Sequence, residues 1–126
     1  MRKRTQKTRC EKRQLRKSEE ICRTYDKVQS ACADYLDQRE DVVRIRCNVE
    51  LDGLKDGDYT TDFVCEKENG ELMVRECVYR QYLTKPMTAR LLESSRNYWL
   101  SRGVSDWGIV VDAVNEEQDK GDESNE

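Results

Sequence analysis

Two acidic residues, Asp62 and Glu76, have the types and the spacing that could hold a hard divalent cation. They lie in the stretches 58–65 and 71–80, which are separated by the tight turn Glu68-Asn69-Gly70. Both stretches are predicted to be strands, so the turn would bring the acids side by side on a β-hairpin. Paired carboxylates bind Mg²⁺, and the bound metal can generate a hydroxide for phosphodiester cleavage. The hairpin therefore predicts a metal site.

Each acid also has an alternative role. Glu76 lies in the middle of an apolar row on its predicted strand, and a buried carboxylate is costly unless it is paired, hydrogen-bonded or metal-bound. Asp62 and Glu76 could share a cation, or each could cap a backbone group or pair with an arginine. The candidate arginines are Arg44, Arg46, Arg75 and Arg80.

The composition excludes several other kinds of site. The chain has no histidine, which rules out Ser-His and Cys-His nucleophilic mechanisms and histidine zinc sites. Its six cysteines form no C-x-x-C pair, and Cys47, Cys65 and Cys77 fall in predicted strands, so we expect reduced, buried thiols. No apolar run approaches the roughly 20 residues of a membrane span, and no signal peptide is recognisable. We therefore expect a cytoplasmic protein without a membrane partner.

Charge is distributed unevenly along the chain. Residues 1–17 carry nine basic residues and one acid, and the stretch 112–126 carries seven acids and one lysine. A basic segment of this density can neutralise nucleic-acid phosphates, or it can be a solvated terminus. We expect the acidic tail, residues 115–126, to be disordered. The candidate nucleic-acid contacts are Arg2, Lys3, Arg4, Lys7, Arg9, Lys12, Arg13, Arg16 and Lys17.

Hydrophobic periodicity predicts an α/β domain with a mixed central sheet flanked by helices. Residues 1–19 are expected to form a basic helical arm, residues 20–114 the folded domain, and residues 115–126 the tail. Within the domain we predict helices over 20–39 and 86–102. The predicted strands cover 42–51, 59–66, 72–80 and 107–112. Because a helix separates the last two strands, that pair should be parallel.

Several motifs follow one another in a recognisable order. Tyr59-Thr-Thr-Asp62-Phe lies on the second predicted strand, and Asn69-Gly70-Glu-Leu-Met-Val-Arg-Glu76 crosses the turn onto the third. Lys85-Pro-Met-Thr-Ala-Arg-Leu-Leu opens the second helix, and Trp107-Gly-Ile-Val-Val follows it. Together these motifs resemble the PD-(D/E)XK nucleases, and within them the amino-terminal domain of TnsA-type transposon endonucleases. The resemblance covers about residues 20–114.

The resemblance implies a restriction-endonuclease-like αβββαβ core and a metal-dependent endonuclease. Its substrate would be double-stranded DNA, its cofactor Mg²⁺ or Mn²⁺, and its partner a separate transposase of a mobile genetic element. Asp62 and Glu76 would bind the metal, and Asp34 would be the acid of the first helix. The family pattern continues Glu-x-Lys, but Val78 stands at the lysine position. Arg80, displaced by about 7 Å along the strand, and Lys85 are the candidate replacements.

Two functions are therefore compatible with the sequence. One is an active endonuclease with the catalytic set Asp62, Glu76, Arg80, Lys85 and Asp34. The other is an inactive nuclease-fold factor that binds DNA or a protein, such as an accessory or anti-defence protein of a phage or transposon. The sequence leaves a homo-oligomer open.

Overall fold

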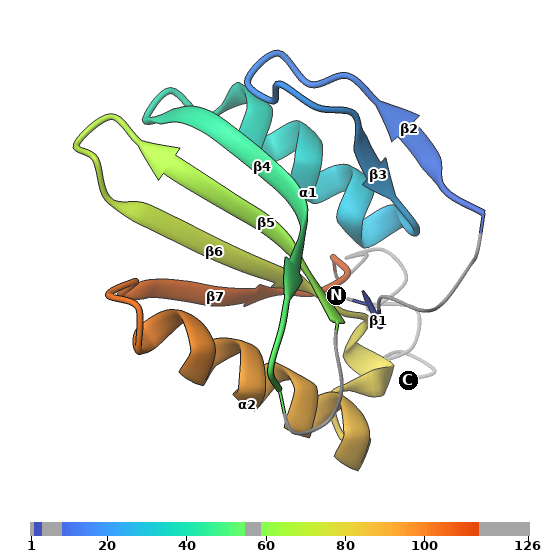
Figure 1. Ribbon diagram of the computed structural model, residues 1–126. Helices are drawn as coiled ribbons and strands as arrows, with labels where there is room; N and C mark the ends of the chain where they lie inside the picture. The colour runs from blue at the N-terminus through green and yellow to red at the C-terminus, as the bar shows by residue number, and fades with distance from the viewer. Residues whose placement is uncertain (1, 4–8, 55–58, 114–126) are drawn as a thin grey trace, which may run out of the picture.

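The computed structural model describes residues 2–3, 9–54 and 59–113. Two helices, α1 (Lys27–Gln38) and α2 (Pro86–Leu100), pack against a mixed β-sheet, and a two-stranded ribbon lies beside α1 (Figure 1). Neighbouring residues of one strand contribute to different cores, because side chains alternate between the faces of a strand. Phe63 packs in the core that includes α1, whereas Val64 packs in the core that includes α2. The two helices therefore cover opposite faces of the sheet, and the predicted α/β class is confirmed.

The main sheet has the predicted strand order. β4 (Val42–Leu51), β5 (Tyr59–Lys67) and β6 (Leu72–Cys77) form an antiparallel meander, and β7 (Asp106–Val110) pairs with β6 in parallel. A short strand, β1 (Arg2–Lys3), pairs with β5 at Tyr59 and Thr60. The ladder between β5 and β6 begins only at Phe63.

Local signals explain where most elements begin and end. The Asp26 carboxylate accepts a hydrogen bond from Gln29 N at 2.8 Å and so caps the start of α1. Pro86 lies in the first turn of α2, where its missing N–H costs nothing. Gly103 follows that helix with a φ of 90°, and Gly70 closes the β5–β6 hairpin with a φ of 88°. Glycine tolerates this conformation better than other residues do.

The amino-terminal region differs from the prediction. Over the described residues 9–26, the expected helical arm (1–19) and the start of the expected helix (20–39) are replaced by β2 (Glu11–Arg13) and β3 (Cys22–Thr24). The first helix begins only at Lys27. Tertiary contacts take the place of helical hydrogen bonds there. The backbone N–H groups of Arg16 and Lys17 donate to the Asp37 carboxylate at 3.1 and 3.0 Å. The segment is thus docked on α1 through its backbone, and the helical spacing predicted the wrong element.

The third strand of the meander ends earlier than predicted. β6 ends at Cys77, and residues Arg80–Tyr82 form a 3₁₀ turn, η1. Val78 N still donates to Val110 O at 2.9 Å, but the backbone of Arg80 then turns away to bond the Asp112 carboxylate. Arg80 therefore does not continue the strand on which Glu76 lies.

Cys22 on β3 and Cys47 on β4 form a disulfide, with a Cα–Cα distance of 5.4 Å. The prediction of reduced cysteines is wrong for this pair, because the ribbon lies along the outer edge of β4, a contact that spacing alone does not reveal. The other four cysteines are free thiols, and three of them, Cys32, Cys65 and Cys77, are buried.

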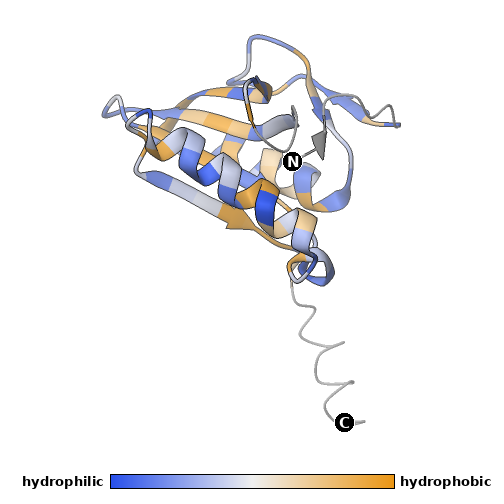
Figure 2. Cartoon of the chain, turned by 60° about the horizontal axis from the view of Figure 1, so that its bottom comes forward, coloured by the Kyte–Doolittle hydropathy of each residue, from blue (hydrophilic) through white to orange (hydrophobic). Residues whose placement is uncertain are grey.

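Apolar residues gather between the helices and the sheet. Figure 2, which brings the bottom of the Figure 1 view forward, shows polar residues along the outer surface of the helix in the foreground. On the α2 side the core contains Tyr59, Val74, Leu91 and Trp99, all buried. Among the described residues, no helix is long and apolar enough to cross a membrane.

Candidate functional site

Asp62 and Glu76 lie opposite each other where the β5–β6 ladder ends. The last paired residues are Phe63 and Arg75, and Asp62 and Glu76 are the next residues along the two strands. Asp62 N donates to Glu76 Oε1 at 3.0 Å, and Cys77 N donates to Asp62 Oδ2 at 2.8 Å. The two carboxylates thus accept backbone N–H groups that a regular ladder would have paired. The structure brings the two acids together; their role as metal ligands stays a prediction.

A helix contributes one further donor to each acid. From α1, Gln29 Nε2 donates to Asp62 Oδ1 at 3.3 Å, while Gln29 Oε1 accepts from Tyr25 N at 2.7 Å. From α2, Ser95 Oγ donates to Glu76 Oε2 at 2.5 Å. All four carboxylate oxygens therefore accept a hydrogen bond from the protein. The hydrogen-bonded series Gln29, Asp62, Glu76 and Ser95 runs from α1 through the sheet to α2, and we call it the acid network.

Trp107 extends the acid network to the last strand. Its indole Nε1 on β7 donates to Ser95 Oγ at 3.0 Å. Ser95 is fully buried and can donate to Glu76 while it accepts from Trp107. Each polar side chain of the acid network therefore has a hydrogen-bond partner, as buried polar groups require.

Burial dominates the electrostatics of the acids. Asp62 is 2% exposed and Glu76 is 0% exposed. Loss of hydration, followed by the negative charge of Asp62, raises the pKa of Glu76 to about 7, against the opposing hydrogen bonds of Ser95 and Asp62 N. Burial likewise raises the pKa of Asp62, opposed in part by the N–H of Cys77. The two groups titrate as one unit, and close to neutral pH the pair retains a proton that separate exposed carboxyls would lose.

Two more buried polar contacts fix α2 against β5 next to the acids. The Tyr59 hydroxyl donates to Leu91 O at 2.9 Å, and Trp99 Nε1 donates to Thr61 Oγ1 at 3.0 Å. Burial raises the pKa of Tyr59, so its hydroxyl remains a donor throughout the physiological range. Ser95 is consequently held at the sheet by neighbours on both sides in the helix.

Gln29 and Ser95 were not singled out as site residues from the sequence. Ser95 falls in the apolar row of its helix, and Gln29 shares a helical face with Cys32, Ala33 and Leu36. A polar residue on an otherwise apolar helical face needs a buried partner. That signal was available and would have pointed to Gln29.

The other predicted catalytic residues have partners elsewhere. Asp34 is exposed on α1 and forms an ion pair with Arg13. Arg80 is exposed, and both its backbone N and its guanidinium Nε bond Asp112, at 2.7 and 3.1 Å. Lys85 lies before α2, with its ammonium 5.7 Å from the centre of the Tyr82 ring. None of these three side chains has a recorded contact with Asp62 or Glu76 in the part of the chain that the structure describes.

The sequence also allowed an arginine to neutralise each acid. Arg75 and Arg44, which lie on β6 and β4, have other acidic partners instead. Arg75 pairs with Asp106, at 2.8 Å between Nη2 and Oδ1, and Arg44 lies 3.8 Å from Glu66. Hydrogen bonds from backbone, amide and hydroxyl groups take the place of guanidinium groups around the acid network.

The acids fit a hydrated metal ion poorly in this arrangement. Across residues 2–3, 9–54 and 59–113, no group of three Asp, Glu, Cys or His side chains could hold a metal. Mg²⁺ can bind to one or two carboxylates, but it then keeps several water ligands. Asp62 and Glu76 are buried and already hydrogen-bonded on every oxygen. Entry of a hydrated ion would require the acid network to open.

The predicted nucleic-acid residues have different surroundings in the structure. Arg13 donates to Ser30 O at 3.0 Å, and the side chains of Arg16 and Lys17 donate to carbonyl groups at the end of α1. These three cations therefore anchor the segment. Arg9 and Lys12 are exposed. Arg2 and Lys3 form the short strand β1, and Arg4 and Lys7 lie outside the described residues, as does the acidic tail.

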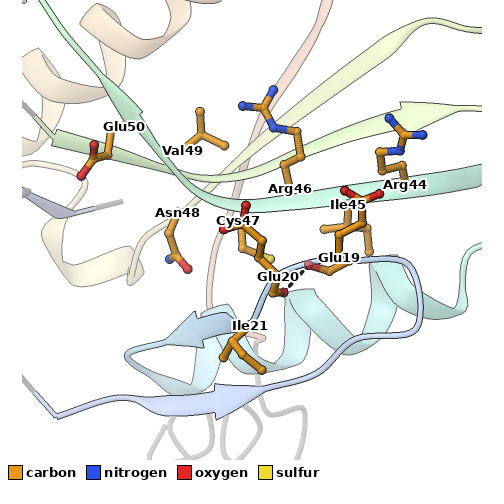
Figure 3. Close-up of a pocket in the computed structure, with 11 residues that line it drawn as sticks. Glu19, Glu20, Ile21, Arg44, Ile45, Arg46, Cys47, Asn48, Val49 and Glu50 are labelled. Carbon is orange, nitrogen blue, oxygen red and sulfur yellow. Dashed lines mark hydrogen bonds between the residues drawn. The ribbon is translucent and has the colours of Figure 1, made fainter.

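A groove of about 420 Å³ runs along the outer edge of β4 (Figure 3). Its strand side carries Arg44 and Arg46, and its loop side carries Glu19 and Glu20. Neither Asp62 nor Glu76 lines this groove. The groove is therefore separate from the acid network, and its mixed charge gives it no preference for a polyanion.

No protein-family model matches this chain, and no curated protein matches it. The resemblance to the PD-(D/E)XK nucleases accordingly stays a prediction from the order of the motifs.

Proposed function

We propose that this protein is a DNA-binding protein with a nuclease-like fold in which the acid pair joins both helices to the sheet and does not cleave DNA. The observation that supports this most directly is the closed acid network. Each oxygen of Asp62 and Glu76 accepts a hydrogen bond from the protein, and both side chains are buried. A metal-bound hydroxide needs open coordination positions and access for the phosphodiester.

The surroundings of the pair support the same proposal. Phosphodiester cleavage is helped by a cation placed where negative charge develops, and the residue two positions after Glu76 is the buried, apolar Val78. The candidate replacements Arg80 and Lys85 contact Asp112 and Tyr82 instead. A non-cleaving protein of this fold would keep the acids because their network joins both helices to the sheet.

DNA binding is supported by the charge of the amino-terminal region and by the resemblance stated above. Nine basic residues lie within residues 1–17. Such a density of positive charge gives salt-dependent affinity for a phosphate backbone through release of counterions. Of the described members, Arg9 and Lys12 are exposed and so available to a ligand.

A second candidate function, a Mg²⁺-dependent endonuclease, is favoured by one observation: the two acids occupy opposed positions on adjacent strands at the end of a ladder. In that function Asp62 and Glu76 would hold the ion, which would supply an activated water. Gln29 and Ser95 would then have to exchange their present hydrogen bonds for others.

The two functions are separated by measuring binding and cleavage on the same samples. Supercoiled plasmid is incubated with the wild-type protein and Mg²⁺ or Mn²⁺, and binding to a fluorescent DNA duplex is followed by anisotropy. Binding without nicking is the expected result. Nicking that is lost in Asp62→Asn but retained in Glu68→Gln, an exposed carboxylate in the β5–β6 turn, would establish the endonuclease instead. Absence of both binding and nicking would contradict both functions.

A further inference from the structure

The ribbon formed by β2 and β3 has two chemically different faces. Its register pairs Glu11 with Thr24, Lys12 with Arg23, and Arg13 with Cys22. Cys22 and Thr24 are buried, so their face is the inner one. Since side chains alternate along a strand, Lys12 and Arg23 lie together on the outer face, and both are exposed.

Lys12 and Arg23 form a pair of like charges at directly opposed positions. Opposed residues of an antiparallel pair have Cβ atoms about 4.5–5.5 Å apart, and like charges there are destabilising. Neither side chain forms an ion pair within the parts of the chain that the structure describes. An anion that binds both cations would remove the repulsion and would gain two charge-assisted hydrogen bonds.

The ribbon is fixed to the domain on its inner side. The Cys22–Cys47 disulfide joins β3 to β4. One position further along each strand, Arg23 N donates to Asn48 Oδ1 at 2.9 Å and Asn48 Nδ2 donates to Arg23 O at 3.0 Å. Asn48 has a φ of 56°, a conformation that asparagine tolerates better than most residues.

The neighbouring strand is fixed as well. The guanidinium of Arg13 donates to the hydroxyl and the carbonyl of Ser30 at 3.1 and 3.0 Å, and it pairs with Asp34 on α1. Lys12 is thereby held on the outer face by a residue next to it in sequence. Because the backbone of the ribbon is already fixed, binding through this cation pair orders no further backbone, which favours affinity.

We propose that the outer face of the β2–β3 ribbon binds the phosphate backbone of duplex DNA, with Lys12 and Arg23 as the contacting pair. This rests on the proposed function, in that it names where the DNA binds. A two-stranded β-ribbon has dimensions that the major groove of B-DNA accepts, and the charge of the pair complements phosphate. Arg23 was not among the basic residues predicted from sequence, because it lies outside the dense amino-terminal run.

The test compares two double variants that remove the same charge. Lys12→Ser with Arg23→Ser alters the ribbon, and Arg90→Ser with Arg96→Ser alters two exposed arginines of α2. Binding to a fluorescent duplex is measured by anisotropy across a series of KCl concentrations. Each lost phosphate contact reduces the slope of log Kd against log salt by about 0.9. We therefore expect a reduction of about 1.8 for the ribbon variant and a clearly smaller one for the control.

A charge reversal distinguishes the loss of a DNA contact from the loss of folding. Lys12→Glu places an opposite-charge pair at the same position, so the thermal midpoint without DNA should rise while the affinity for DNA falls. A fall in both would show that the position is needed for folding, and would overturn the assignment.

The remaining outcomes are also decisive. If the wild-type protein binds DNA and the ribbon variant keeps its salt slope, or the control loses as much, then the ribbon is not the contact, while DNA binding itself stands. If the wild-type protein binds no duplex, or binds only an acidic polypeptide such as polyglutamate, then both the ribbon assignment and the proposed function fail.

Discussion

Replacing Glu76 with glutamine should remove a specific pH dependence of stability. Glu76 is fully buried, and burial together with the charge of Asp62 raises its pKa from 4.5 in the unfolded chain to about 7. A carboxyl with a raised pKa in the folded state stabilises the fold fully below pH 4.5, and this contribution is lost as the pH rises through 7. At about 1.4 kcal/mol per pKa unit, the loss is on the order of 3 kcal/mol.

The variant retains the shape and most of the contacts of the wild-type residue. The amide oxygen of the introduced glutamine can accept from Asp62 N, and its NH₂ group can donate to Ser95 Oγ. Glutamine does not titrate, so the free energy of unfolding of Glu76→Gln should fall less steeply with pH than that of the wild-type protein between about pH 4.5 and pH 8. The pKa of Asp62 is also raised by burial, and its contribution remains in the variant. The variant should consequently be more stable than the wild-type protein at pH 8.

The assay is urea denaturation followed by tryptophan fluorescence at several pH values across this window. Glu68→Gln serves as the control, because it removes the same charge from an exposed turn and should keep the wild-type slope. A wild-type free energy of unfolding that is constant or increases with pH would contradict the reasoning. So would a Glu76→Gln variant with the same slope as the wild-type protein.

Two further changes test other contacts of the fold. Gln29→Leu removes the amide that bonds Asp62 and should lower the free energy of unfolding by about 1–3 kcal/mol. The control Gln38→Leu, at an exposed position of the same helix, should change it by less than about 0.5 kcal/mol. Equal effects of the two variants in urea denaturation would exclude a buried bond at Gln29. Cys22→Ser opens a cross-link between residues 25 apart in sequence and should cost about 3 kcal/mol under oxidising conditions, while Cys10→Ser should cost little. Alkylation of all six cysteines in denatured, unreduced protein, detected by mass spectrometry, would contradict the disulfide.

The sheet and α2 could be predicted because their signals are local. Alternating apolar residues, the Asn69-Gly70 turn, Pro86 and Gly103 each act within a few residues. The parallel pairing of β6 and β7 then follows from the helix that connects them. These signals were sufficient to place Asp62 and Glu76 on neighbouring strands.

The amino-terminal ribbon could not be predicted in the same way. Its three-residue strands are too short to show a period, and long-range contacts determine their conformation, above all those of Asp37 with the backbone of residues 16 and 17. The Cys22–Cys47 disulfide depends on the same packing. Helical spacing between Ile21 and Tyr25 was misleading, because Ile21 is 45% exposed.

The sequence predicted the positions of the two acids but not all of the groups that surround them. The sequence left three roles open for the acids: a shared cation, capping of a backbone group, or pairing with an arginine. The structure shows backbone N–H groups bonded to both acids, and it adds donors from Gln29 and Ser95 that the sequence analysis did not name. The pKa of Glu76 is raised as well. Which of these roles the acids take depends on what the helices place above and below the sheet, and strand periodicity carries no information on that.

Titration of Mn²⁺ into the protein in a calorimeter shows whether the acid network is closed or can hold a catalytic metal. The titration is run above the pKa of Glu76 of about 7, where ionised acids give a metal its best chance to bind. We predict no binding heat beyond dilution for the wild-type protein and for Glu76→Gln alike. Stoichiometric Mn²⁺ binding that disappears in Glu76→Gln and persists in Glu68→Gln would contradict the proposal that the network is closed.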